Sequence, residues 1–92
     1  MNQAPKTENA LLIEQDRMRR LADFFKSHRL KSGLSLESVA EALELNVSTY
    51  RGYEDGRLQM PLEDVFALTN FLNIAPEDVM DLVHGLYKLG AT

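Results

Sequence analysis

The stretch LSLESVAEALELNVSTYRGYEDG, residues 34–56, decides the fold of this chain. Ser35 can cap a first short helix, because a serine oxygen accepts hydrogen bonds from the free N–H groups at a helix start. The apolar residues that follow recur at three- and four-residue steps, which predicts one buried helical face. They are Leu36, Val39, Ala40 and Leu43.

A second short helix follows in the same stretch. Asn46 can cap its start and Gly56 can end it. Its inward face is expected to hold Val47, Tyr50 and either Tyr53 or Glu54. Leu45 is apolar in the expected turn and should fill the angle between the two helices. Helices this short are unstable alone, so both must pack on a third element.

Three further helices are predicted around this pair. The first runs from Glu8 to Lys31 and is capped by Gly33. Another begins at Pro61, which suits a first helical turn. The last begins at Pro76 and is expected to end at Gly90. With no alternating β-pattern in the sequence, the chain is predicted to be all-α, with five helices.

The outer helices also show apolar faces. The face after Pro61 is expected to hold Leu62, Val65, Phe66, Leu68, Thr69 and Leu72. The face after Pro76 is expected to hold Val79, Leu82, Val83 and Leu86. In the first helix, the apolar part from Leu11 to Met18 has no evident partner in the chain. It either folds back onto the domain or frays, or it forms a self-association surface.

Composition narrows the class of protein. The 92 residues are 45% hydrophobic, which fits one domain with a small core. The absence of cysteine excludes disulfides and thiolate metal sites, and it fits a cytoplasmic location. No apolar run approaches the roughly 20 residues of a membrane span, and no secretory leader is recognisable. His28 and His84 lack suitable partners for a metal site.

The net charge of −4 is unevenly distributed. Residues 1–34 carry seven Lys or Arg against four acidic residues, whereas residues 35–92 carry three against ten. The acidic part includes the two short helices. Acidic side chains there would repel an anionic partner: Glu37, Glu41, Glu44, Glu54 and Asp55. The basic residues of the first helix could attract such a partner only if that helix faces it; they are Arg17, Arg19, Arg20, Lys26 and Lys31.

Residues 21–80 resemble the Cro and phage-repressor (XRE-like) helix-turn-helix family. The resemblance is carried by an ordered series along the chain: Arg29, Gly33-Leu34-Ser35, Val39-Ala40, Leu43, Leu45, Ser48-Thr49-Tyr50, Glu54-Asp55-Gly56, Leu62, Val65, Leu72 and Ile74. It implies a five-helix, lambda-repressor-like domain with an extended N-terminal helix. We expect the helix-turn-helix domain over 21–80, a helix extension over 8–20 before it, and a helix end and tail over 81–92. Residues 1–7 have no apolar period and contain a proline, so they are expected to be a disordered tail.

The resemblance also implies a DNA site. The helix from about Asn46 to Glu54 would enter the major groove, and the preceding helix would cross the backbone. The implied DNA-binding residues are Ser35, Val47, Ser48, Thr49, Arg51, Gly52 and Arg57. Arg51 is the strong base reader among them, since arginine pairs with guanine through two hydrogen bonds.

Two residues are implied to act as a structural pair. Arg29 and Glu54 occupy positions that in this family bridge the first helix to the end of the recognition helix. The alternative is two separate surface charges. Tyr50 and Tyr53 are expected to pack in the core rather than stack on bases. Leu36 and Glu44 depart from the family pattern, which has Gln and Gly at these positions, and Glu44 would need a left-handed backbone.

Two functions follow from the sequence. The first is a sequence-specific DNA-binding regulator, of the repressor type that the resemblance implies, acting as a homodimer on double-stranded DNA. The second is a helix-turn-helix fold used to bind another protein through Leu36 and the acidic face. A dimer could form through Leu11, Met18, Leu82, Val83 and Leu86. No enzymatic motif, cofactor, metal or membrane partner is expected.

Overall fold

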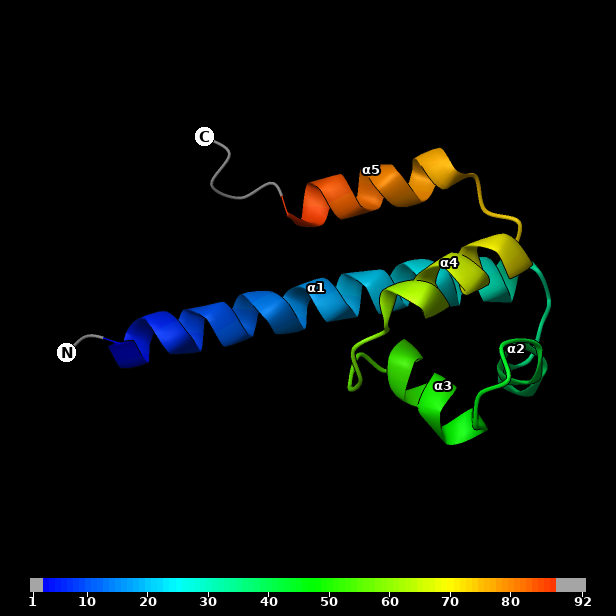
Figure 1. The fold of residues 1–92 in the computed structure, drawn as a ribbon, viewed down its shortest axis with the longest axis horizontal. Helices are drawn as coiled ribbons and strands as arrows, with labels where there is room; N and C mark the ends of the chain where they lie inside the picture. Colours follow the sequence, from blue (N-terminus) through cyan, green and yellow to red (C-terminus); the bar gives the residue numbers. More distant parts are fainter. Residues whose placement is uncertain (1–2, 88–92) are drawn as a thin grey trace.

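Five helices make up the part of the chain that the structure describes, residues 3–87 (Figure 1). In this computed structural model they are α1 (Gln3–Lys31), α2 (Leu36–Ala42), α3 (Val47–Glu54), α4 (Leu62–Phe71) and α5 (Pro76–Leu86). Residues 3–87 contain no strand, so the prediction of an all-α fold is confirmed. The predicted end of the last helix at Gly90 lies outside the described residues.

The long first helix starts earlier than the sequence indicated. α1 begins at Gln3, five residues before the expected start at Glu8, so residues 3–7 of the predicted tail are helical. Pro5 is compatible with this, because the first four N–H groups of a helix have no partner within it. Gly33 ends the helix as predicted, with a left-handed φ of +73°. The N–H of Leu34 reaches back to the carbonyl of Arg29 at 3.3 Å.

The two short helices are joined as the sequence predicted. The Ser35 hydroxyl accepts from the N–H of Ser38 at 3.0 Å and caps α2. Glu44 adopts the left-handed conformation, with a φ of +58°. The N–H of Leu45 then donates to the Ala40 carbonyl at 2.8 Å, which closes the turn. Asn46 holds the capping position of α3 without a side-chain hydrogen bond to the helix.

The same turn recurs at the end of α4. Asn73 has a φ of +58°, and the N–H of Ile74 donates to the Thr69 carbonyl at 2.9 Å. Gly56 has a positive φ after α3, where the N–H of Arg57 bonds the carbonyl five residues earlier. The ends of α1, α2, α3 and α4 are thus all closed by a residue in the left-handed conformation. This turn satisfies carbonyls that a helix end would otherwise leave unpaired.

The core lies where α1, α2, α3 and α4 meet. Its most deeply buried large side chains come one from each helix: Phe25, Val39, Tyr50 and Leu68. Ala40 of α2 is also buried. Burial of these side chains supplies the main free energy that holds the short helices in place.

The predicted inner face of α4 is wrong at two positions. Leu62 and Phe66 are 68% and 62% exposed. Val65, Leu68, Thr69 and Leu72 fill the contact with the core, and Phe66 lies about 100° around the helix from Val65. Pro61 stands at the N-cap, one position earlier than expected, so Leu62 begins the helix at the edge of the core.

The last helix lies along α1, and Arg17 connects the two. The Nε of Arg17 donates to the Leu86 carbonyl, at the C-terminal end of α5, at 3.1 Å. The guanidinium also lies 4.1 Å from the centre of the Tyr87 ring. A cation at this position suits the negative end of the helix dipole. Among the described residues, no helix is both long and apolar enough to cross a membrane.

Candidate nucleic-acid interface

Helix α3 has an inner and an outer face. Tyr50 and Tyr53 are buried, with their rings edge to face at 6.3 Å between centres. This confirms that the two tyrosines pack in the core and are not available to stack on bases. On the outer face, Ser48 and Arg51 are exposed, while Val47 and Thr49 are half-buried. The side chains best suited to reach a DNA groove therefore point away from the fold.

Gly52 does not belong to the exposed face. It is buried, and a Cβ added there would lie 2.6 Å from Leu58 Cδ1. Its carbonyl accepts from the N–H groups of Arg57 at 3.0 Å and Leu58 at 3.1 Å. The loop after α3 thus covers Gly52, and we correct its assignment as a DNA-binding residue. A side chain at position 52 would have to displace the Leu58 side chain that covers it.

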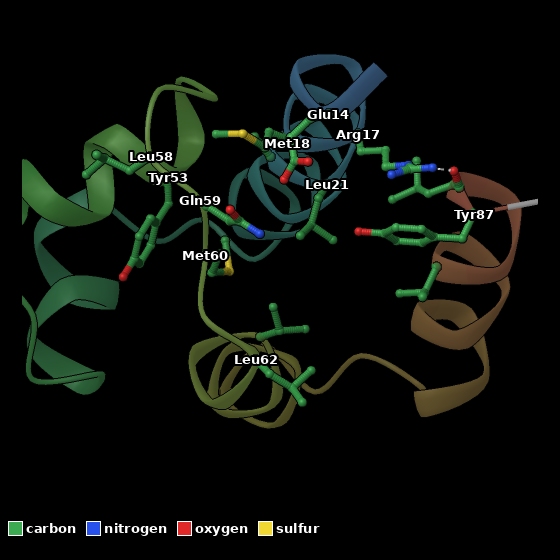
Figure 2. Close-up of a pocket in the computed structure, with 14 residues that line it drawn as sticks. Glu14, Arg17, Met18, Leu21, Tyr53, Leu58, Gln59, Met60, Leu62 and Tyr87 are labelled. Carbon is green, nitrogen blue, oxygen red and sulfur yellow. Dashed lines mark hydrogen bonds between the residues drawn. The ribbon is translucent and has the colours of Figure 1, made fainter. Parts of the chain in front are cut away.

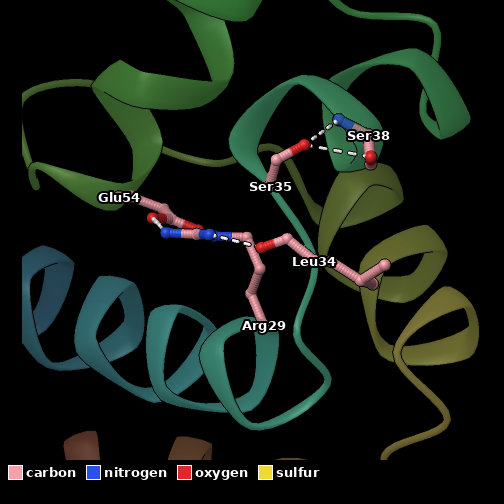
Figure 3. A network of polar contacts seen from close by, with 5 residues as sticks. All are labelled: Arg29, Leu34, Ser35, Ser38 and Glu54. Atoms are coloured by element: carbon pink, nitrogen blue, oxygen red, sulfur yellow. Dashed lines mark hydrogen bonds and ion pairs between the residues drawn. The ribbon is translucent and has the colours of Figure 1, made fainter.

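A buried ion pair joins α1 to the end of α3 (Figure 3). Arg29 donates from Nε to Glu54 Oε2 at 2.7 Å and from Nη2 to Oε1 at 3.0 Å. Its Nη1 donates to the Leu34 carbonyl at 2.7 Å, which also fixes the segment before α2. The side chains of Arg29 and Glu54 are only 9% and 4% exposed. The predicted pair is therefore present, and it sets the orientation of α3.

The ion pair and the core alter the pKa values of nearby groups. The hydrogen bond with Glu54 raises the pKa of Arg29, so this side chain stays charged. Burial raises the pKa of Tyr50, and the neighbouring Glu54 carboxylate adds to the effect. Burial also raises the pKa of Tyr53 to about 12, with a further contribution from its hydrogen bond to Asp64 at 2.9 Å. Both tyrosines are therefore neutral at physiological pH.

The acidic residues around α3 are not equivalent. Glu54 is neutralised by Arg29 and buried, so it opposes phosphate binding less than its position in the sequence suggested. Glu37, Glu41, Glu44 and Asp55 are exposed. Arg57 is also exposed, and its Nε lies 3.4 Å from Asp55 Oδ2. Such an exposed contact is weak, so Arg57 is free to exchange it for a phosphate.

One arginine of α1 lies beside the loop that follows α3. A Cβ added at Gly56 would be 3.5 Å from the Arg19 Cα, so the two backbones are in close approach. The Arg19 side chain is exposed. Its neighbours are committed elsewhere, since Arg20 pairs with Asp16 at 3.0 Å and Arg17 contacts α5. The fold thus places Arg19 of α1 beside the loop that follows α3.

A hollow of about 260 Å³ separates α1, α5 and the loop before α4 (Figure 2). Three of the proposed dimer residues line it, namely Met18, Val83 and Leu86. Leu86 is buried within the monomer, Leu82 is half-buried, and Leu11 is exposed. No group of three or more potential metal ligands occurs among the described residues. The lining is mostly apolar, which gives this face no evident chemistry of its own.

Comparison with known families identifies the domain. A family model described as a helix-turn-helix domain matches residues 20–82, more than half of the chain. The chain belongs to this helix-turn-helix family. The match spans the C-terminal part of α1, all of α2 to α4 and most of α5, and it agrees with the XRE-like resemblance found in the sequence. Comparisons with curated proteins and with solved structures found no match.

Membership of the helix-turn-helix family supports the class of DNA-binding regulators. In such domains the second helix of the motif is the one that enters the major groove. In this helix-turn-helix protein that helix is α3, and its exposed residues are the candidates for base contact.

Proposed function

We propose that this protein is a sequence-specific DNA-binding transcriptional regulator that acts as a homodimer on an operator with two half-sites. The observation that carries the proposal is the outward face of α3. Ser48 and Arg51 are exposed there, while the Arg29–Glu54 pair holds the helix against α1. An exposed arginine on a rigid, groove-sized helix is the arrangement that direct base reading needs.

The residues of the proposed interface have distinct roles. Arg51 reads guanine through two hydrogen bonds, and Val47 contacts a thymine methyl group. Ser48, Thr49 and Arg57 contact the phosphate backbone, which positions the helix without carrying sequence information. Ser35 contributes mainly through structure, because its oxygen is occupied by the N–H of Ser38. The start of α2 still presents free N–H groups to a phosphate.

The charge of the protein limits its affinity. DNA binding draws on phosphate neutralisation, and the acidic residues near α3 oppose it. A single domain should therefore bind weakly and with a strong salt dependence. Two domains on one operator overcome this limit, since the second binding event becomes intramolecular. This is the physical reason for proposing a homodimer.

Binding to a selected operator tests the proposal. Wild-type protein is used to select duplexes from a random pool at low salt, and affinity is then measured by fluorescence anisotropy. Arg51→Ala should weaken binding by about 1–3 kcal/mol and relax the sequence preference at one position. Arg57→Ala should weaken all sequences alike and lower the salt slope by about one. Arg20→Ala is the control, because Arg20 is exposed but pairs with Asp16.

Selection of no duplex by the wild-type protein at low salt would contradict the proposal. Equal effects of Arg51→Ala and Arg20→Ala would show that α3 does not read bases.

A protein-binding role is the second candidate. It is favoured by three exposed glutamates beside the half-buried Leu36, namely Glu37, Glu41 and Glu44. Leu36 packs partly on the core, so Leu36→Gln is a milder probe than a charged substitution. If the motif binds a protein, Leu36→Gln abolishes capture of that partner in a pull-down, and the wild type has no DNA affinity. If it binds DNA, the same variant retains operator binding. A non-enzymatic, cytoplasmic protein is expected in either case.

A further inference from the structure

The N-terminal half of α1 extends beyond the rest of the fold (Figure 1). The nearest anchoring contacts are those of Arg17 with Leu86 and of Arg19 with Gly56. Residues 3–16, here named the overhang, precede both contacts and span about 21 Å at 1.5 Å per residue. Leu11 and Leu12 in the overhang are 57% and 63% exposed. A soluble domain rarely leaves adjoining large apolar residues uncovered without a partner.

The apolar face of the overhang continues the buried face of α1. Leu11, Met18 and Phe25 are spaced by seven residues and share one side of the helix, with a drift of only about 20° per step. Phe25 is fully buried, Met18 is half-buried and Leu11 is exposed. The seam that packs on the domain therefore runs on past the domain's edge. Leu11 and Met18 therefore offer an apolar strip on this side of α1 that a partner helix can cover.

A groove beside the overhang gives a second helix room to pack. It has a volume of about 310 Å³ and lies between α1 and α5, with Leu12 and Ile13 on one side and Gly85 and Leu86 on the other. A Cβ added at Gly85 would meet nothing within 4 Å, so this side of α5 is open. The groove shares Arg17 and Leu86 with the hollow of Figure 2. The uncovered surface thus extends from the overhang onto the face of α5.

Charge indicates what covers this surface. The overhang contains Lys6 against Glu8, Glu14 and Asp16, so its net charge is −2. DNA and anionic membranes select basic helices, which this segment is not. The lining of the α1–α5 groove contains two arginines and one carboxylate, so the acidic overhang of a second copy meets net positive charge there. Self-pairing is therefore the match that the charges favour.

We propose that the overhangs of two copies pack against each other about a two-fold axis and that each also covers the partner's α1–α5 groove. The inference rests on the proposed homodimer and gives it an interface. A stable interface takes about 20–30 residues from each side, more than the overhang alone supplies. Covering the groove provides the remainder. The dimer surface is thus centred on Leu11, Leu12 and Ile13, and the buried Leu86 contributes little.

The position of the overhang connects dimer formation to DNA binding. The Arg19 backbone packs against Gly56, so the overhang leaves the domain beside the loop that follows α3. Pairing of overhangs therefore brings two recognition helices into one particle. DNA with two half-sites should gain affinity from the pairing, whereas a single half-site should not.

Sedimentation velocity over a wide concentration range tests the interface without DNA. Wild-type protein should sediment as a dimer at high concentration, and the double variant Leu11→Glu, Leu12→Glu should remain a monomer. Leu30→Glu is the matched control, because Leu30 is also 57% exposed and lies on α1, but at the opposite end. Thermal melts of all three proteins show whether the domain remains folded. A monomeric wild type or a dimeric double variant would overturn the proposal.

Cross-linking gives a second readout that does not depend on destabilising a helix. The chain has no cysteine, so Leu12→Cys introduces a single thiol. Mild oxidation should convert this variant to a covalent dimer, and Leu30→Cys should stay monomeric. Equal cross-linking of the two variants would contradict an interface at the overhang. Binding of the double variant to a single half-site separates the proposed function from the proposed interface. Loss of half-site binding would contradict the proposed function. If half-site binding is retained, the change in sedimentation reports on the interface alone.

Discussion

Removing the Glu54 carboxylate should be among the most damaging single changes in this protein. Arg29 makes two charged hydrogen bonds to Glu54, at 2.7 and 3.0 Å, and both side chains are less than a tenth exposed. Glu54→Ala leaves the guanidinium buried, with the Leu34 carbonyl as its remaining partner. Breaking such a pair costs about 3–5 kcal/mol. A domain of this length has roughly 5–14 kcal/mol of stability, so a substantial share of it, from about a fifth upward, would be lost.

Replacing both partners should be far less harmful. The double variant Arg29→Met, Glu54→Leu fills the same space with apolar side chains and leaves no buried charge. Exchanges of this kind are often neutral or stabilising, so we expect a change within about 1 kcal/mol of wild type. The large single effect and the small double effect together would measure the coupling between the two side chains.

Urea unfolding followed by helical circular dichroism measures these values. Comparable slopes for all variants are needed, because a changed slope signals a different unfolded state. A loss below about 1 kcal/mol for Glu54→Ala is the size expected of a surface pair and would contradict the expected cost of breaking a buried ion pair. Operator binding by the double variant adds a functional readout. Wild-type specificity in that variant would show that the pair is not needed to orient α3.

Three further outcomes can be checked with the same unfolding assay. Tyr53→Phe should cost about 0.5–1.5 kcal/mol of stability, because it removes the hydrogen bond to Asp64. Tyr50→Phe should be neutral or stabilising, since the Tyr50 hydroxyl has no hydrogen-bond partner among the described residues. Equal effects of the two variants would contradict this. The pKa of Tyr53 is raised to about 12 from an unfolded value of about 10, so stability should hold below pH 10 and fall between the two values as the unfolded state ionises first. Tyr53→Phe should flatten that fall, and an unchanged pH profile would argue against it. Gly52→Ala should change stability by less than about 1 kcal/mol, because the gain in helix propensity offsets the cost of displacing Leu58. In a Leu58→Ala background the same substitution should stabilise the protein by about 1 kcal/mol. A loss of stability in both backgrounds would show that the added methyl group clashes with the loop backbone.

Local signals in the sequence predicted much of the fold. The Gly33 cap, the Ser35 cap and the left-handed Glu44 all depend on a few neighbouring residues, so the sequence alone specifies them. The Arg29–Glu54 contact joins distant parts of the chain, and its prediction depended on the family resemblance. The inward placement of Tyr50 was predicted in the same way.

Other features could not be predicted from periodicity. Leu62 and Phe66 satisfy a broad helical pattern, but the width of the core contact depends on how α1 and α5 pack around α4. The burial of Gly52 depends on the path of the loop through Leu58. A signal was present there, because glycine inside a helix costs about 1 kcal/mol relative to alanine and often marks a close approach. The helical start at Gln3 was missed because residues 3–7 lack an apolar period.

The overhang of α1 allows the spacing of the half-sites and the sequence of the half-sites to be set by different parts of the protein. The C-terminal ends of α1, α2, α3 and α4 are each fixed by a residue in the left-handed conformation. Insertions at these turns would therefore change the packing of the core and the position of α3. An insertion of seven residues before Arg17 would instead lengthen the helix by about 10 Å and keep its apolar side in phase. In a dimer of the proposed kind, such insertions would reset the distance between half-sites. The bases read at each half-site would remain unchanged, so operator spacing and operator sequence could evolve independently.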